Sequence, residues 1–451
     1  MLPFIIASLL FILVIAYGYG NLSIFICGIF YTIILAIIAR KLFGKNNRLF
    51  QRLTLIWIIA ITFVVIVYFL YYKTYGVPYD KQGMDDYFYD VIWSDECLKY
   101  GYMTINDLLA EPEYCFHNSK TYLLLIVWMK YIFRFFGGYH TIDIRMFNMM
   151  MLTISGMLMG KYAEKYLGAD KKTAIRVVTA IVLFPNAMFI SSLVYRDALV
   201  AFFIVSIFYL WTCFFKKTAK GKFLTVFLTI VITYLTYYCR LQAILYLALA
   251  IGVGLLNNSP DKNVLFGKSY LKKFLLFFIA FIVLFNVGDA VFANFNRFVN
   301  SYNKMISNGE GIQAKIRGIP LLPVGWIFQT LFFLITPMYR DIVPVEMIKD
   351  PISILRGFVS WGTIYLLFLY PYVFRFLKRM NNIVVIYAVI LLSVAIVTSG
   401  FRHVIMTYPM LLTIGIMGRS QASEQSVQNA RLMSVTAAGV FGFAFVLLKV
   451  L

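Results

Sequence analysis

Near-continuous apolar runs recur from residue 3 to residue 449, and they constrain the fold more than any other feature of the chain. Each run holds about 16 to 22 residues, close to the roughly 20 that a helix needs to cross about 30 Å of hydrocarbon. Hydrophobic residues make up 61% of the chain and charged residues only 14%, unlike ordinary soluble domains. The sequence therefore predicts an all-α fold, a polytopic membrane helical bundle.

The basic residues form short clusters between the apolar runs. Such clusters mark the cytoplasmic side of a membrane protein. They do not form one basic face, so the net charge of +21 does not indicate nucleic acid as a partner. The clusters are Arg40, Lys41, Lys45, Arg48 and Arg52; Lys161, Lys165, Lys171, Lys172 and Arg176; Lys216, Lys217, Lys220 and Lys222; Lys272 and Lys273; and Arg375, Lys378 and Arg379.

With every cluster placed inside, the pattern predicts about 13 spans in the cell membrane, with the N-terminus in the cytoplasm. The first run is expected to be a retained helix, because it lacks the basic start and small-residue cleavage site of a signal peptide. The predicted spans are 3–19, 22–39, 53–72, 144–160, 177–195, 198–215, 223–239, 241–257, 272–290, 357–374, 382–398, 404–418 and 432–449.

Two further apolar segments, 121–136 and 322–338, break the alternation of sides, and we expect that neither crosses fully. In the first, Lys130 and Arg134 share one helical face, which suits a helix on the outer surface. The second lies between two prolines, as in a re-entrant segment. In the alternative, one of the two segments spans the membrane and the charge pattern fails locally.

The topology places the acidic stretch GMDDYFYD in an outer loop, 73–120, with Asp85 and Asp86 side by side. Other acids of this loop, including Asp95, are expected to be solvated, and the same reading stays open for Asp85 and Asp86. Cys97 and Cys115 lie in this loop too. They are either a disulfide in an oxidising compartment or two free thiols.

Charged residues also lie where outer turns meet the membrane, which by default marks function. The candidates are Arg196 and Asp197 after Pro185, Arg240, Arg402 and His403 with the nearby Tyr408, and Arg145 with Asp143 as its expected partner. Three separate turns thus bring arginines to the membrane face that carries Asp85 and Asp86. In the alternatives to a functional role, Arg196 and Asp197 form only a local ion pair, and the side chain of Arg240 only extends to the membrane–water interface.

Guanidinium groups bind phosphate through paired hydrogen bonds and stay charged. A carboxylate beside them suits transfer of a group from a phosphorylated lipid to a hydroxyl, because it can accept the hydroxyl proton while the cations stabilise the leaving phosphate. Asp85 or Asp86 is the predicted base, and Arg402, Arg240, Arg196 and His403 would bind the donor phosphate. A divalent cation, Mg²⁺ or Mn²⁺, could join Asp85 or Asp86, although no ligand spacing requires a metal.

With these residues in view, the chain resembles the GT-C superfamily of membrane glycosyltransferases, in particular bacterial proteins similar to dolichyl-phosphate-mannose protein mannosyltransferases. The resemblance rests on GMDDYFYD, FGGYHTIDIRMFNMMMLTISGMLMGKYAEKYLG, LFPNAMFISSLVYRDALVAFFIV and FRHVIMTYPMLL. It implies a catalytic aspartate in the first large outer loop, here Asp85 or Asp86. It also implies a polyprenyl-phosphate-linked sugar donor taken from the outer leaflet, and surface helices after that loop.

On this basis we expect three regions: a two-span extension (1–52), a GT-C-like catalytic region (53–418) with outer loops 73–143 and 291–356, and a C-terminal span (419–451). The predicted activity is transfer of the sugar to a cell-envelope glycan or lipid acceptor at the extracytoplasmic face. A polysaccharide polymerase or ligase using an undecaprenyl-pyrophosphate oligosaccharide is the alternative. A transporter or flippase of lipid-linked sugars is a third hypothesis.

Overall fold

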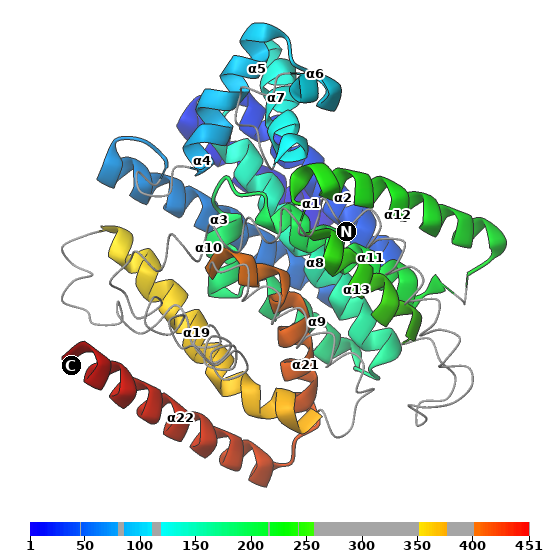
Figure 1. The fold of residues 1–451 in the computed structure, drawn as a ribbon, viewed down its shortest axis with the longest axis vertical. Helices are drawn as coiled ribbons and strands as arrows, with labels where there is room; N and C mark the ends of the chain where they lie inside the picture. Colours follow the sequence, from blue (N-terminus) through cyan, green and yellow to red (C-terminus); the bar gives the residue numbers. More distant parts are fainter. Residues whose placement is uncertain are drawn as a thin grey trace.

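A computed structural model describes residues 1–45, 47–79, 85–110, 119–214, 217–241, 243–256, 351–376 and 401–450, and every regular element in these ranges is a helix (Figure 1). The elements are α1 (Leu2–Tyr19), α2 (Leu22–Phe43), α3 (Asn47–Tyr75), α4 (Asp85–Tyr87), the π-helix η1 (Phe88–Trp93), α5 (Ser94–Tyr100), α6 (Ile105–Ala110), α7 (Lys120–Phe133), η2 (Arg134–Phe136), α8 (Thr141–Tyr166), α9 (Lys171–Val182), α10 (Pro185–Ser191), α11 (Asp197–Thr212), α12 (Ala219–Cys239), α13 (Ala243–Leu256), α19 (Pro351–Phe376), η5 (Phe401–Met406), α21 (Tyr408–Ser420) and α22 (Glu424–Val450).

Six of the described helices are long and apolar enough to cross a membrane: α1, α2, α3, α8, α12 and α19. The bent pair α9 and α10 brings the number to seven if it counts as one span. These helices confirm the all-α class and indicate a multi-pass membrane protein. The predicted total of about 13 spans is not shown, and the predicted spans 272–290 and 382–398 and the segment 322–338 lie outside the described residues.

Helix α8 is the centre of the bundle. It packs against α2, α3, α9, α11 and α21, and most of its side chains are buried. Its Gly160 faces α9 so closely that a Cβ atom there would lie 2.9 Å from the Ala174 carbonyl oxygen and 2.6 Å from a methyl group of Val178. Small residues permit this close approach between helices, which holds α8 and α9 together by packing where lipid supplies no hydrophobic driving force.

Other helices turn large apolar side chains outward. On α1, Leu10 is 60% exposed, and on α12, Phe223 and Ile230 are 75% and 64% exposed. A soluble protein rarely shows such continuous apolar faces. We therefore expect these two faces to contact lipid.

The apolar segment predicted as one span over 177–195 is broken. Helix α9 ends at Val182, α10 begins at Pro185, and the two helices meet at an angle of 52°. Proline lacks an N–H group and cannot continue the hydrogen bonding of the preceding helix, but it fits the first position of a new one. Pro185 therefore divides this apolar segment into two helices.

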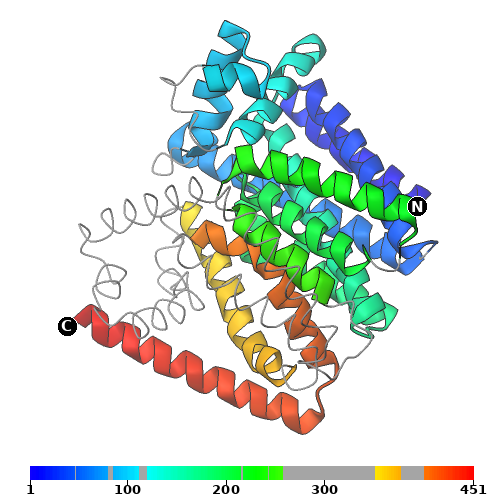
Figure 2. The same ribbon diagram turned by 45° about the vertical axis from the view of Figure 1, so that its right-hand side comes forward.

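The polar segment after α3 folds into a cap at one end of the bundle. Helices α5, α6 and α7 lie together at the top of the molecule in both views (Figures 1 and 2), and α5 packs against η1 and α7. The segment 121–136 forms α7 and η2, and the 14-residue α7 is too short to cross a membrane alone. Gly137, with φ of 88°, ends this unit and turns the chain toward α8.

Candidate functional site

A pocket of about 450 Å³ lies where the cap meets the start of α8. Its walls come from four parts of the chain: the end of α3 with the residues after it, the π-helix with α5, α7 with η2, and the turn into α8. The lining residues are Tyr68, Pro78, Tyr79, Asp90, Val91, Asp95, Lys130, Arg134, Gly138, Tyr139, His140 and Thr141. Carboxylates, cations and phenols thus share one cavity between the cap and the bundle.

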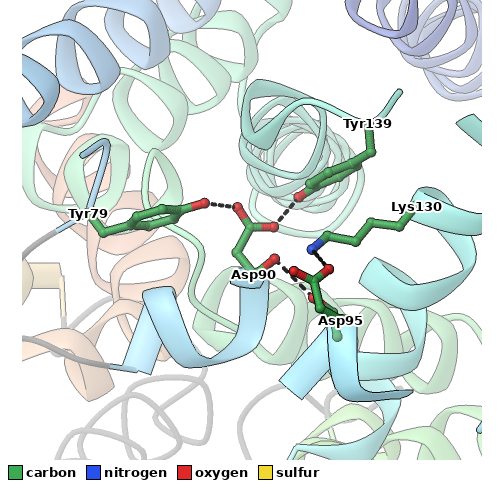
Figure 3. Close-up of polar contacts among 6 residues, drawn as sticks. Tyr79, Asp90, Asp95, Lys130 and Tyr139 are labelled. Atoms are coloured by element: carbon green, nitrogen blue, oxygen red, sulfur yellow. Dashed lines mark hydrogen bonds and ion pairs between the residues drawn. The ribbon is translucent and has the colours of Figure 1, made fainter. Parts of the chain in front are cut away.

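Asp90 is the buried carboxylate of this pocket, with 1% of its surface exposed. The hydroxyl of Tyr79 donates a hydrogen bond to one carboxylate oxygen, and that of Tyr139 donates to the other at 2.5 Å (Figure 3). Burial, and next the charge of Asp90, raise the pKa of both tyrosines, so both remain phenols that donate to the carboxylate. Asp90 lies in the π-helix, an element that often marks functional positions.

Cations lie at the open side of the pocket. Lys130 Nζ forms an ion pair with Asp95 at 2.7 Å, and the Asp95 side chain is 60% exposed (Figure 3). The Arg134 guanidinium stacks over the ring of Tyr131 at 4.1 Å. Asp95 is therefore solvated, as the sequence predicts, but it is also paired. The ion pair partly neutralises the charge of Lys130. Arg134 is the second positively charged group at the opening of the pocket.

The turn into α8 is fixed by a reciprocal cap. The His140 backbone N–H donates to Asp143 Oδ2 at 3.0 Å, while the Ile142 N–H donates to His140 Nδ1 at 3.2 Å. Ser23 of α2 also donates to Asp143 Oδ2, at 2.6 Å. Burial lowers the pKa of His140 to about 4, so its Nδ1 keeps the lone pair that the cap needs.

Arg145, one turn further into α8, is fully buried directly behind this turn. One end of its guanidinium donates to the Pro78 carbonyl oxygen, and its charge lies 5.8 Å from the Tyr68 ring centre. Its Nε and Nη1 atoms have no hydrogen-bond partner in the part of the chain that the structure describes. Arg145 does not line the pocket itself, but Pro78 and Tyr68, which it contacts, do, so its guanidinium lies behind this part of the pocket wall.

The expected pairing of Arg145 with Asp143 is wrong. Asp143 Oδ2 is used by Ser23 and by the His140 backbone, and no ion pair joins Asp143 to Arg145 among the described residues. The reason is local: a carboxylate at the third position of a helix folds back to cap it. The arginine two residues later lies on a different face of the helix and points toward the segment after α3.

The turns at Arg196 and Arg240 meet beside the cap. Arg240 Nη1 and Asp197 Oδ1 form an ion pair at 2.5 Å whose side chains are only 2% and 4% exposed. Arg196 Nη1 donates to the Tyr89 hydroxyl of η1 at 3.2 Å. The acid that Arg240 needs is therefore Asp197, and the local Arg196–Asp197 pair does not form, because Arg196 turns to the π-helix instead.

Asp86 is fully buried, so the alternative that it is only a solvated loop acid is wrong. Its Oδ1 accepts a hydrogen bond from the Tyr87 backbone N–H at 3.0 Å, and it does not line the pocket. The side chain of its neighbour Asp85 lies outside the described residues. Of the two described acidic side chains in GMDDYFYD, Asp86 and Asp90, only Asp90 lines the pocket.

Of the three candidates near the end of the chain, Arg402, His403 and Tyr408, the structure describes the side chain of Tyr408 alone. The backbone of η5, which carries Arg402 and His403, packs against α10, α11 and α21, but both side chains lie outside the described residues. Tyr408 is buried in the bundle, where its ring packs against Phe184 at 4.7 Å and its hydroxyl accepts from Asn186 at 3.4 Å. It does not reach the pocket.

No group of three or more His, Cys, Asp or Glu side chains able to hold a metal ion occurs among the described residues, so the divalent cation stays a prediction. Cys97 is a buried free thiol whose pKa burial raises to about 12, and Cys115 lies outside the described residues.

Reasoning from the sequence missed Asp90, Tyr79 and Tyr139 as a unit. Local spacing gave no signal for this unit, because Tyr79 and Tyr139 lie 11 and 49 residues from Asp90 in the sequence. Comparisons with protein-family models, with curated proteins and with solved structures found no match for this chain. The GT-C resemblance and the three predicted regions therefore stay predictions.

Proposed function

We propose that the protein is a membrane glycosyltransferase that moves a sugar from a polyprenyl-phosphate-linked donor to a hydroxyl group of a glycan or lipid acceptor. One observation carries the proposal. The pocket between cap and bundle is lined by a buried carboxylate, Asp90, and by the cations Lys130 and Arg134, while the buried guanidinium of Arg145 contacts two residues of its wall, Pro78 and Tyr68. A base for a hydroxyl proton and a cation for a phosphate are the two groups that this reaction needs.

In the proposed reaction the acceptor oxygen attacks the anomeric carbon, and the bond from that carbon to the phosphate oxygen breaks. The bonding electrons leave with the lipid phosphate, and Asp90 takes the proton of the acceptor hydroxyl. Lys130 and Arg134 bind the phosphate at the opening, and the charge of Arg145, behind the Pro78 and Tyr68 wall, stabilises it electrostatically. Tyr79 and Tyr139 hold the carboxylate in place.

The geometry changes the roles expected from the sequence. Asp90 replaces Asp86 as the proposed base, because it lines the pocket and Asp86 does not; the side chain of Asp85 lies outside the described residues. Arg240 is already neutralised by Asp197, so we assign this pair to positioning of the turn beside η1. Arg196, which holds Tyr89, supports the π-helix rather than the donor phosphate.

The test is sugar transfer by the purified protein in nanodiscs, with a panel of radiolabelled undecaprenyl-phosphate sugars and a lipid or glycan acceptor. Asp90→Asn is expected to lower kcat about 10²–10⁴-fold, as loss of a general base does. Arg145→Gln is expected to raise KM for the donor. Asp95→Asn is the matched control, since it removes an exposed carboxylate of the same pocket, and it is expected to keep kcat within about threefold of the wild type.

The proposal fails if Asp90→Asn, shown to be folded by its thermal unfolding midpoint, turns over as fast as Asp95→Asn. A ladder of product lengths instead of one increment would favour the polymerase. Passage of lipid-linked sugar across the bilayer without consumption of the donor would favour the transporter.

A further inference from the structure

A second cavity, of about 1130 Å³, lies at the opposite end of the bundle from the pocket described above. Helix α3 carries Arg48 and Arg52 of this cavity in its first turns, and it ends at Tyr75, just before the first pocket. At 1.5 Å per residue, its 29 residues span about 43 Å, the thickness of a bilayer with its headgroups. The two cavities therefore lie at opposite membrane surfaces.

The walls of this second cavity are strongly cationic. Six cationic side chains line it, and no acid is among the described lining residues: Arg48 and Arg52 from α3, Lys171, Lys172 and Arg176 from α9, and Arg419 from α21. The carboxylate of Asp170, next to Lys171, accepts a hydrogen bond from the Thr173 N–H at 2.9 Å and so caps α9. The six cations of the described lining make the cavity attractive to anions.

Apart from the amide of Gln51, its remaining described lining is apolar or carries hydroxyl groups. Ile175 and Ala180 of α9, Ile416 of α21 and Val427 of α22 provide apolar surface, and Thr179, Tyr365 and Ser420 add hydroxyl groups. A small hydrophilic anion would gain nothing from the apolar part. A molecule with a phosphate group and a hydrocarbon chain would contact both parts.

We infer that this cavity binds the phosphate headgroup of an anionic phospholipid, with the first part of an acyl chain against Ile416 and Val427. Guanidinium groups hold phosphate through paired hydrogen bonds, and four of the six cations are arginines. The positive-inside pattern explains basic residues at this surface, but it does not require three helices to gather them around a cavity that also has apolar lining. This site is independent of the proposed transferase pocket.

The test is lipid binding measured by native mass spectrometry of the full chain in detergent, with phosphatidylglycerol and phosphatidylcholine as probes. The variant Lys172→Gln/Arg176→Gln/Arg419→Gln removes three cations from the cavity. The control Lys41→Gln/Lys220→Gln/Lys222→Gln removes three cations outside it, at the same end of the bundle.

The wild type is expected to bind phosphatidylglycerol at least tenfold more tightly than phosphatidylcholine. The cavity variant should lose that preference, and the control should keep it within about twofold. Equal loss in both variants would overturn the proposal, since it would show a general effect of charge. Displacement of phosphatidylglycerol by micromolar pyrophosphate would also overturn it, because the site would then hold a soluble phosphate.

Discussion

Removal of one partner from the buried Asp197–Arg240 ion pair should be among the most destabilising polar substitutions in the bundle. The two charged atoms lie 2.5 Å apart, and the side chains are only 4% and 2% exposed. Asp197→Asn leaves the charge of Arg240 in place without the opposing carboxylate. Loss of one partner of a buried pair costs about 3–5 kcal/mol, because the remaining charge stays desolvated.

This free energy corresponds to a measurable change in thermal stability. An unfolding entropy of about 2.1 cal/mol/K per residue gives about 1 kcal/mol/K for 451 residues. Asp197→Asn should therefore lower the unfolding midpoint by about 3–5 °C. The intrinsic fluorescence of the six tryptophans, followed in detergent during heating, measures that midpoint.

The matched control replaces both charges with apolar side chains of similar volume, Asp197→Leu with Arg240→Met. It removes the pair without leaving a buried charge, so we expect it to be close to the wild type or more stable. A midpoint for Asp197→Asn within 1 °C of the wild type would refute the reasoning. A double variant as unstable as Asp197→Asn would refute it as well, since hydrogen bonds other than the ion pair would then dominate.

Three further predictions concern packing, pH and surface charge. Gly160→Ala should cost about 1–3 kcal/mol by overpacking α8 against α9, whereas Gly439→Ala, with open space around it, should not lower the unfolding midpoint. The pKa of His140 is depressed to about 4 from 6.5, so the folded protein favours the neutral ring; its contribution to stability is complete above pH 6.5 and is lost as the pH falls toward 4. His140→Asn, which can still cap α8, should flatten that part of a stability profile measured from pH 7 to pH 4. Lys130→Gln should change the free energy of unfolding by less than about 1 kcal/mol, because its partner Asp95 is largely exposed; a larger loss would show that the pair closes the pocket.

The sequence alone determined the class of the fold and the end of the bundle at which charges gather. Apolar runs of spanning length require helices, because no water in the bilayer core can satisfy backbone groups. Residues of two basic clusters, Lys171 and Arg48, line one cavity, while Arg196 contacts the cap at the other end; which end faces the cytoplasm stays a prediction. The break at Pro185 was also readable, since proline cannot continue a helix.

Only the tertiary structure decided which charged groups meet. Asp197 is adjacent to Arg196 in the sequence yet pairs with Arg240, 43 residues away, because the first turn of α11 packs beside the turn after α12. In the sequence nothing distinguishes Asp90 from the other acids of its loop, whereas in the structure the hydroxyl groups of Tyr79 and Tyr139 both donate hydrogen bonds to it. Partners in space depend on how helices pack, and local spacing carries no record of contacts between distant segments. The sequence therefore supplied candidate types of residue, and only the fold decided that Asp90, and not Asp86, lines the pocket.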